Sequence, residues 1–258
     1  MEIKQNHYDI YLDREISLEN VVFLYKRTPF PLDADINDFI EKNWEKNKAK
    51  SPDIYNGKLY NLVDVVKDDG CFTFFYDVMD YKTLIATKEI EFKKRCPDYK
   101  PVYLVVTGIL KTSDNKILIG SDLRLKNNLQ SWKFPGGFFD VEQDKTILDC
   151  LQRECQEEIG SFAFLDPKII NISKNLDHNF VAVICLVPIK ETSDEVLAFN
   201  SKNKDKIIDS NEMQVIKFLD FESSSIADIL NSNLISLSPT TLIGLKQIQV
   251  NLEKALVK

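Results

Sequence analysis

The chain has 258 residues, a length that suits one large domain or two modest ones and argues against short peptides and repeat arrays. Hydrophobic residues make up 44% and charged residues 28%, so the composition predicts a soluble globular protein with a sizeable core. The net charge of −7 argues against a surface that coats nucleic acid or an anionic membrane.

Cysteine and histidine usage narrows the chemistry further. The five cysteines are odd in number and contain no CxxC pair, which disfavours a disulfide framework and a zinc knuckle and favours a reduced, cytoplasmic setting. Two histidines leave little material for His-dependent triads. The N-terminus shows no secretory signal, and the longest apolar run, 180–189, is far shorter than the roughly 20 residues of a membrane-spanning helix, so no membrane role is predicted.

The first hundred residues predict a small α+β module. Apolar residues in the segments 8–12, 21–25, 58–63 and 71–75 predict strands, and the last two are joined by a hairpin turn at 67–70. A helix is predicted after Asp33 or Asp35, either of which can cap it, because Ile36, Ile40 and Trp44 recur at helical spacing. This module is assigned to residues 1–98 as an accessory domain.

A boundary is predicted near Pro97 and Pro101, which bracket a short polar segment. The second domain, residues 99–258, is expected to hold the following elements in chain order: a strand at 102–110 buried on both faces, a turn at 113–116, its partner strand at 117–120, a helix at 146–159, a strand at 180–189, a polar stretch at 191–211, a strand at 213–221, and a last helix that begins at Ser238-Pro239.

The acidic residues are concentrated in one window. Residues 137–160 hold seven acidic and two basic side chains. On the predicted helix, Glu154, Glu157 and Glu158 stand at i, i+3 and i+4, so their carboxylates share one face and repel one another. Hard oxygen ligands in such a cluster suit Mg²⁺, with Mn²⁺ as an alternative. The competing interpretation of an acidic helix face is a solvated surface.

The segments around this helix resemble the signature of the Nudix hydrolases. Trp132-Lys133-Phe134-Pro135-Gly136-Gly137 is a tight loop whose glycines let backbone amides approach an anion. The helix then ends in Arg153-Glu154-Cys155-Gln156-Glu157-Glu158-Ile159-Gly160, which is similar to the family's R-E-hydrophobic-x-E-E-x-G.

The match departs from the family pattern in the loop. Gly137 lies two residues farther from Arg153 than the pattern expects. Counting back from Arg153 places Lys145 where the family has its first glutamate, and counting forward from Gly137 gives Gln143. Glu142 or Asp144 is available as a substitute after a loop adjustment.

The resemblance implies an α/β/α sandwich around a mixed sheet, over roughly 101–258, that cleaves a small-molecule nucleoside diphosphate linked to another group. It implies that Glu154, Glu157 and Glu158 bind Mg²⁺ and that the metal activates a water to attack phosphorus. Arg153 is expected to hold a glutamate of the cluster by a bidentate pair. Glu212 is a candidate general base, with a surface glutamate as the alternative.

Substrate contacts are expected from residues in and around the Nudix signature, called the Nudix box below. Arg124 and Lys133 are candidates for phosphate binding, since one lies near the end of the second strand and the other directly precedes the glycine loop. Gly136 and Gly137 are candidates through their amides.

Residues 44–87 also resemble the N-terminal region of a Nudix branch that includes UDP-glucose and UDP-galactose diphosphatases. The resemblance is carried by Trp44, by Tyr55-Asn56-Gly57 and by Asp80-Tyr81 with the threonine-containing stretch after it. It implies a UDP-sugar substrate, with Asn56 and Tyr81 as contacts; the alternative is a plain β-meander. Because the catalytic fold does not need the first hundred residues, they are expected to contribute specificity, homodimerisation or partner binding. Other candidate functions are ADP-ribose or dinucleotide hydrolysis and a non-catalytic nucleotide sensor. Decapping of mRNA is disfavoured because no extended basic face is visible.

Overall fold

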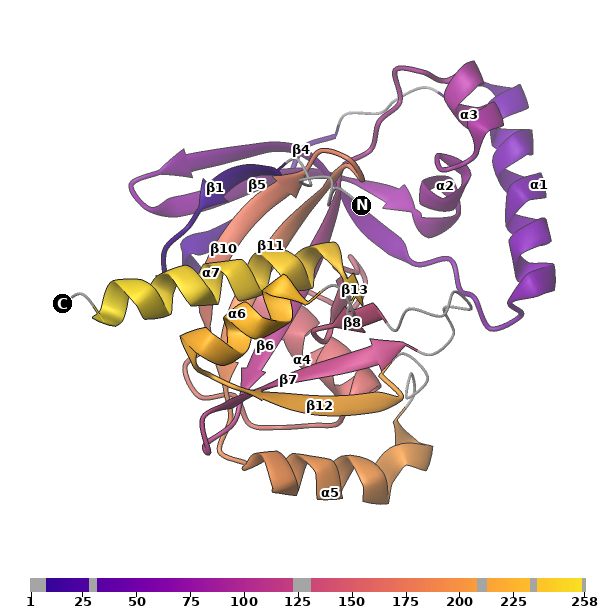
Figure 1. The fold of residues 1–258 in the computed structure, drawn as a ribbon. Coiled ribbons are helices and arrows are strands. Elements are labelled where there is room, and N and C mark those ends of the chain that lie inside the picture. Colours follow the sequence, from indigo (N-terminus) through magenta and orange to yellow (C-terminus); the bar gives the residue numbers. More distant parts are fainter. Residues whose placement is uncertain (1–7, 28–31, 123–130, 208–212, 233–235, 257–258) are drawn as a thin grey trace.

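The computed structural model describes residues 8–27, 32–122, 131–207, 213–232 and 236–256 (Figure 1). The strands are β1 (Tyr8–Leu12), β2 (Ile16–Ser17), β3 (Val21–Tyr25), β4 (Lys58–Asp68), β5 (Cys71–Asp80), β6 (Tyr103–Lys111), β7 (Lys116–Asp122), β8 (Ser131–Lys133), β9 (Gly136–Phe138), β10 (Lys168–Asn175), β11 (Phe180–Pro188), β12 (Val215–Asp220) and β13 (Ser236–Leu237). The helices are α1 (Ala34–Lys50), α2 (Tyr81–Ala86), α3 (Ile90–Arg95), α4 (Ile147–Glu158), α5 (Ser193–Asn203), α6 (Ser223–Asn231) and α7 (Pro239–Leu256), with 3-10 turns η1 (Leu18–Asn20) and η2 (Lys204–Lys206).

The centre of the molecule is a mixed sheet between two layers of helices, as predicted. Its long path runs β1-β10-β11-β6-β4-β5-β3, with β11 parallel to β6 and antiparallel to β10. Helix α4 packs on one face with Leu151 and Cys155 in the core, while α6 and α7 cover the other face with Ile226 and Leu245. In Figure 1, α6 and α7 cross in front of the sheet and α4 lies behind it. None of the helices in the described ranges combines the length and apolar composition of a membrane span.

The predicted accessory domain, residues 1–98, is called the accessory segment from here on, and its described strands are continuous with this sheet. Strands β1 and β2 pair antiparallel with β10, and β4 reaches β6 through Asn61 opposite Tyr103. The predicted boundary at residue 98 therefore separates segments that share hydrogen-bonded strands. Whether residues 1–98 and 99–258 behave as separate domains stays a prediction.

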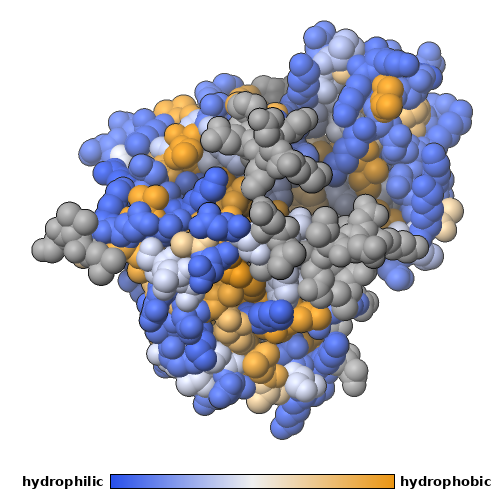
Figure 2. Space-filling view, in the orientation of Figure 1, coloured by the Kyte–Doolittle hydropathy of each residue, from blue (hydrophilic) through white to orange (hydrophobic). Residues whose placement is uncertain are grey.

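The predicted elements of the accessory segment are present. Asp33 is the N-cap of α1, and its carboxylate accepts a hydrogen bond from the amide of Ile36. Hairpin β4–β5 turns at Asp69 and Gly70, whose positive φ angles of 43° and 82° are those of a tight hairpin turn. Helix α1 buries Ile36 and Ile40 against Ala86 and Phe92. The region formed by α1 and α3, at the upper right of Figure 2, exposes mainly hydrophilic residues.

One expectation about the second part is wrong, and one segment contains a helix that was not expected. The predicted partners β6 and β7 share one pair, Lys111 with Ile117, and β7 then leaves to pair with β8 and β12. The polar stretch at 191–211 contains helix α5, which Thr192 and Glu195 begin with a capping box. Strand β10 and helix α6 were not expected from the sequence, although both bury apolar side chains.

Candidate active site

Helix α4 is the rigid support of the site. Thr146 caps it by accepting a hydrogen bond from the Asp149 amide, while the Asp149 carboxylate accepts one from the Thr146 amide. Ile147, Leu151 and Cys155 are buried on the side that faces the sheet. The acidic side chains therefore project from a helix that is fixed at its start and along its core face.

Arg153 donates hydrogen bonds to several carboxylates of the acidic face of α4, which carries Glu154, Glu157 and Glu158. Its Nε and Nη2 donate to both carboxylate oxygens of Asp144, at 3.0 and 2.7 Å. Its Nη1 donates to Glu154 Oε1 at 2.7 Å and to Glu157 Oε2 at 3.2 Å. The bidentate partner is thus Asp144, while the glutamates of the cluster each receive a single bond from Nη1. Burial opposes the charged guanidinium, but the bonds to Asp144 and the charge of Glu154 outweigh it and raise the pKa of Arg153 above its ordinary value.

Asp144 is the loop carboxylate that contacts Arg153. Its side chain is 1% exposed, and its Oδ2 also accepts the amide of Asp140 at 2.9 Å. Of the two substitutes that the sequence offered, the structure places Asp144 against Arg153. Glu142 is exposed on the same loop.

Glu158 is fixed by the glycine loop. Its carboxylate is 2% exposed, and it accepts hydrogen bonds from Lys133 Nζ and, at 3.0 Å, from the amide of Gly136. The Gly136 amide, which is a candidate contact for a substrate anion, binds the Glu158 carboxylate in this structure.

The second glycine makes room for another carboxylate. A Cβ at Gly137 would lie 2.5 and 2.6 Å from the two carboxylate oxygens of Glu154. Gly136 adopts φ +148°, and a Cβ there would collide with the backbone of Val106. The two glycines thus bring the loop into direct contact with the acidic face of α4.

Carboxylates outnumber cations among the described side chains of this face. The carboxylates of Asp144, Glu154, Glu157 and Glu158 lie against two cations, Arg153 and Lys133. Burial raises the pKa of Glu154 to about 7, against the lowering effect of Arg153.

These residues fit a divalent cation by donor chemistry and charge. In the arrangement seen, the carboxylates point to Arg153, Lys133 and Gly136, and no three acidic, histidine or cysteine side chains of the described segments converge closely enough to enclose a metal on their own.

The accessory segment reaches the loop that follows the glycines. The centroid of the Tyr81 ring lies 5.6 Å from the centroid of the Phe138 ring, and Phe138 directly follows Gly137. Asn56 accepts the amide of Lys82 at 2.8 Å and donates to Asp80 at 3.3 Å, so it fixes the start of α2. The Tyr55 hydroxyl donates to Asp140, a contact that the sequence analysis missed.

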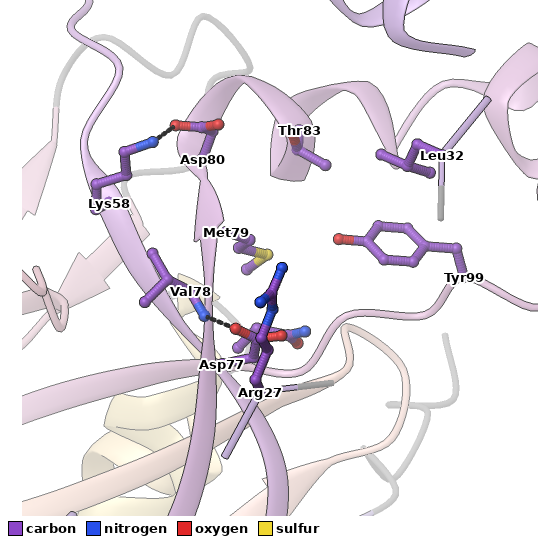
Figure 3. A pocket seen from close by; sticks show the side chains of 10 residues that line it. Arg27, Leu32, Lys58, Asp77, Val78, Met79, Asp80, Thr83 and Tyr99 are labelled. Atoms are coloured by element: carbon purple, nitrogen blue, oxygen red, sulfur yellow. Dashed lines mark hydrogen bonds and ion pairs between the residues drawn. The ribbon is translucent and has the colours of Figure 1, made fainter. Parts of the chain in front are cut away.

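A cavity of about 260 Å³ lies between hairpin β4–β5, α2 and the loop that carries Tyr99 (Figure 3). Its wall includes Arg27, Asp77 and Thr83, and the Lys58–Asp80 ion pair lies at one end. The Tyr99 hydroxyl points toward Met79 and Thr83 in Figure 3. The cavity thus offers both hydrogen-bond donors and acceptors.

Two predicted site residues, Arg124 and Glu212, lie outside the described residues. Their roles in phosphate binding and as general base stay predictions.

Replacing Gly137 with alanine is expected to lower kcat about tenfold or more, because the new methyl group displaces the Glu154 carboxylate. The matched control is Gly108→Ala, whose Cβ would have as its nearest atoms a Leu151 methyl at 3.1 Å, a Val187 methyl at 3.7 Å and the Pro135 carbonyl oxygen at 4.0 Å, none of them a carboxylate. Steady-state hydrolysis and thermal unfolding of both variants test this. Equal activity losses in the two variants would show that crowding of Glu154 is not the cause.

The family match covers the second part of the chain. A family model described as NUDIX domain matches residues 102–232. The solution structure of the E. coli ORF135 protein has a TM-score of 0.39 and 17% identity, over 59% of this chain and 91% of that chain. A NUDIX hydrolase from Nitrosomonas europaea has a TM-score of 0.39 and 14% identity, over 58% of this chain and 89% of that chain. A comparison with proteins of curated function gave no match.

Proposed function

Because this chain belongs to the Nudix family and is a pyrophosphohydrolase of nucleoside diphosphate derivatives, we propose that its substrate is a UDP-sugar, cleaved to UMP and a sugar 1-phosphate. The observation that carries the proposal is the position of the accessory segment. Of the residues that resemble the UDP-sugar branch, Tyr81 packs against Phe138, directly after the glycines, and Asn56 fixes the start of the helix that carries Tyr81. The polar cavity on the same segment supports recognition of a hydroxyl-rich group.

We assign the metal role to the acidic face of α4. Glu154, Glu157 and Glu158 would hold a divalent cation, Mg²⁺ or alternatively Mn²⁺, which when bound polarises the pyrophosphate and lowers the pKa of the attacking water. Arg153 orients Glu154 and Glu157 through Nη1 while Asp144 fixes its other edge. The clustering of these carboxylates around Arg153 and Lys133 supports this assignment, because hard oxygen donors suit such a cation.

The remaining roles belong to the residues around the metal ligands. Lys133 lies against Glu158 and supplies a positive charge beside the metal ligands, where a phosphate oxygen would also bind. Arg124 is assigned to phosphate binding and Glu212 to general base catalysis. Dimerisation through the accessory segment stays part of the proposal.

A substrate screen tests the proposal. The full chain is incubated with UDP-sugars, ADP-ribose, diadenosine polyphosphates and NADH, each with Mg²⁺, with Mn²⁺, and with EDTA as the control. We expect UMP and sugar 1-phosphate from a UDP-sugar, with the reaction abolished by EDTA. Cleavage of ADP-ribose with no cleavage of any UDP-sugar would show that the accessory segment was misassigned, while the metal role of α4 would stand.

A further inference from the structure

Tyr55 lies outside the Nudix box, in the connection between α1 and β4, yet it binds a residue of the box loop. The residue as a whole is 56% exposed, but its hydroxyl donates a hydrogen bond to Asp140 Oδ2. Burial of the hydroxyl and this bond raise the pKa of Tyr55 to about 12. Gly57 leaves the space that the hydroxyl occupies, since a Cβ there would lie 2.6 Å from the Tyr55 oxygen.

Asp140 organises the loop between β9 and α4. Its side chain is buried, and its Oδ1 accepts the amides of Glu142 and Gln143 at 2.8 and 3.3 Å. Its Oδ2 accepts the Gln143 side-chain amide at 3.2 Å in addition to the Tyr55 hydroxyl. This one carboxylate therefore sets the conformation of the loop at the point where the accessory segment meets it.

Asp140 is joined directly to Asp144 by two backbone-mediated bonds. The amide of Asp140 donates to Asp144 Oδ2 at 2.9 Å, and the amide of Asp144 donates to the Asp140 carbonyl at 2.8 Å. Asp144 then takes the bidentate bond from Arg153, whose Nη1 reaches Glu154 and Glu157. A continuous set of hydrogen bonds thus runs from the Tyr55 hydroxyl to two of the proposed metal ligands.

We propose that Tyr55 is a positioning residue, which acts through Asp140 and Asp144 to orient Arg153 and, through it, the carboxylates of Glu154 and Glu157. This inference rests on the proposed role of those carboxylates as metal ligands. It gives the accessory segment a part in catalysis that is separate from substrate recognition. Because Asp140 Oδ2 keeps its bond from the Gln143 side chain when the Tyr55 hydroxyl is removed, the loss changes the orientation of the site more than the stability of the fold.

The test is Tyr55→Phe in the full chain, with Mn²⁺ binding measured by electron paramagnetic resonance without substrate, and kcat and KM measured on whichever pyrophosphate substrate is turned over. Outer-shell partners of metal ligands typically contribute about 10–100-fold, and Tyr55 lies three residues beyond such a partner, Arg153, so we expect Mn²⁺ affinity and kcat each to fall only about 3-fold. KM should stay within about twofold, because substrate contacts are unchanged. Tyr25→Phe, on an exposed ring of β3, is the matched control and should match the wild type.

A second variant tests whether Tyr55 acts through Asp144 and Arg153. Asp144→Asn removes a charge at the middle of the hydrogen-bonded set, so Tyr55→Phe should add little in that background if both act through Arg153. Full additivity, or wild-type Mn²⁺ affinity and kcat in Tyr55→Phe, would overturn the inference. Weaker Mn²⁺ binding in a chain that ignores UDP-sugars would support Tyr55 and reject only the substrate. A wild-type chain that binds no Mn²⁺ would overturn both the metal assignment and the role of Tyr55.

Discussion

Replacement of Glu157 by glutamine is expected to lower kcat by on the order of 10²-fold or more, because even the outer-shell partners of metal ligands contribute about 10–100-fold. Glutamine keeps the shape of the side chain and can still accept the bond from Arg153 Nη1. It removes one negative charge from the face that is proposed to hold the cation. The loss should therefore be one of metal binding and catalysis.

The fold should tolerate this change. The charge of Glu157 is one of the causes that raise the pKa of Glu154, so the two carboxylates repel each other when no metal is bound. Without metal, relief of the repulsion from Glu154 and weakening of the 3.2 Å ion pair with Arg153 oppose each other, so the free energy of unfolding of Glu157→Gln should stay within about 1 kcal/mol of the wild-type value.

Kinetics, Mn²⁺ binding and urea unfolding together test this expectation. Glu253→Gln, on an exposed position of α7, is the matched control and should leave all three unchanged. A Glu157→Gln variant with more than half of the wild-type kcat would show that Glu157 is not a metal ligand. A variant that is inactive because it is unfolded would contradict the expectation on stability.

The elements that the sequence predicts well are those determined by local residues. Helix α4 begins after Thr146 and ends at Glu158 because each of its bounds has a signal close by in the sequence. A capping box marks its start, Gly160 follows its end, and apolar residues recur at helical spacing between them. The hairpin turn at Asp69 and Gly70 is local in the same way. Helix α5 had a comparable local signal in Thr192 and Glu195, and it could have been predicted from that pair.

The long-range pairings of the sheet could not be predicted in this way. Strand β1 was expected, but its pairing with β10 joins residues that are far apart in the chain, and no local pattern specifies that partner. Strands β6 and β7 follow each other through a short turn, which favours a hairpin, yet β7 finds most of its partners in β8 and β12. Tertiary packing decides such choices.

The candidate active site likewise combines features that local sequence predicts with features that depend on long-range contacts. The acidic face of α4 is a local pattern, whereas the choice between Glu142 and Asp144 depends on the conformation of the loop. That conformation is fixed by Asp140, which Tyr55 holds from a segment 85 residues earlier in the chain. The sequence could name both acidic residues but could not choose between them.

Asp144→Ala is expected to give the largest combined loss of stability and activity in the loop. It removes the bidentate partner of Arg153, whose side chain is only 16% exposed, and breaking a buried ion pair typically costs about 3–5 kcal/mol. It also frees the guanidinium to turn away from Glu154 and Glu157, so kcat should fall about 10–100-fold in the fraction that remains folded. Urea unfolding and kcat corrected for the folded fraction measure the two effects separately.

Two further variants keep this prediction testable if the alanine variant does not fold. Asp144→Asn keeps the side-chain shape and one oxygen acceptor for Arg153, so it should retain more stability than Asp144→Ala while still losing activity, because the negative charge opposite the guanidinium is gone. Glu142→Ala changes the exposed acidic residue of the same loop and should leave both quantities at wild-type values. A greater loss in Glu142→Ala than in Asp144→Asn would reverse the assignment, because it would mean that Glu142, and not Asp144, takes the place of the family's first glutamate.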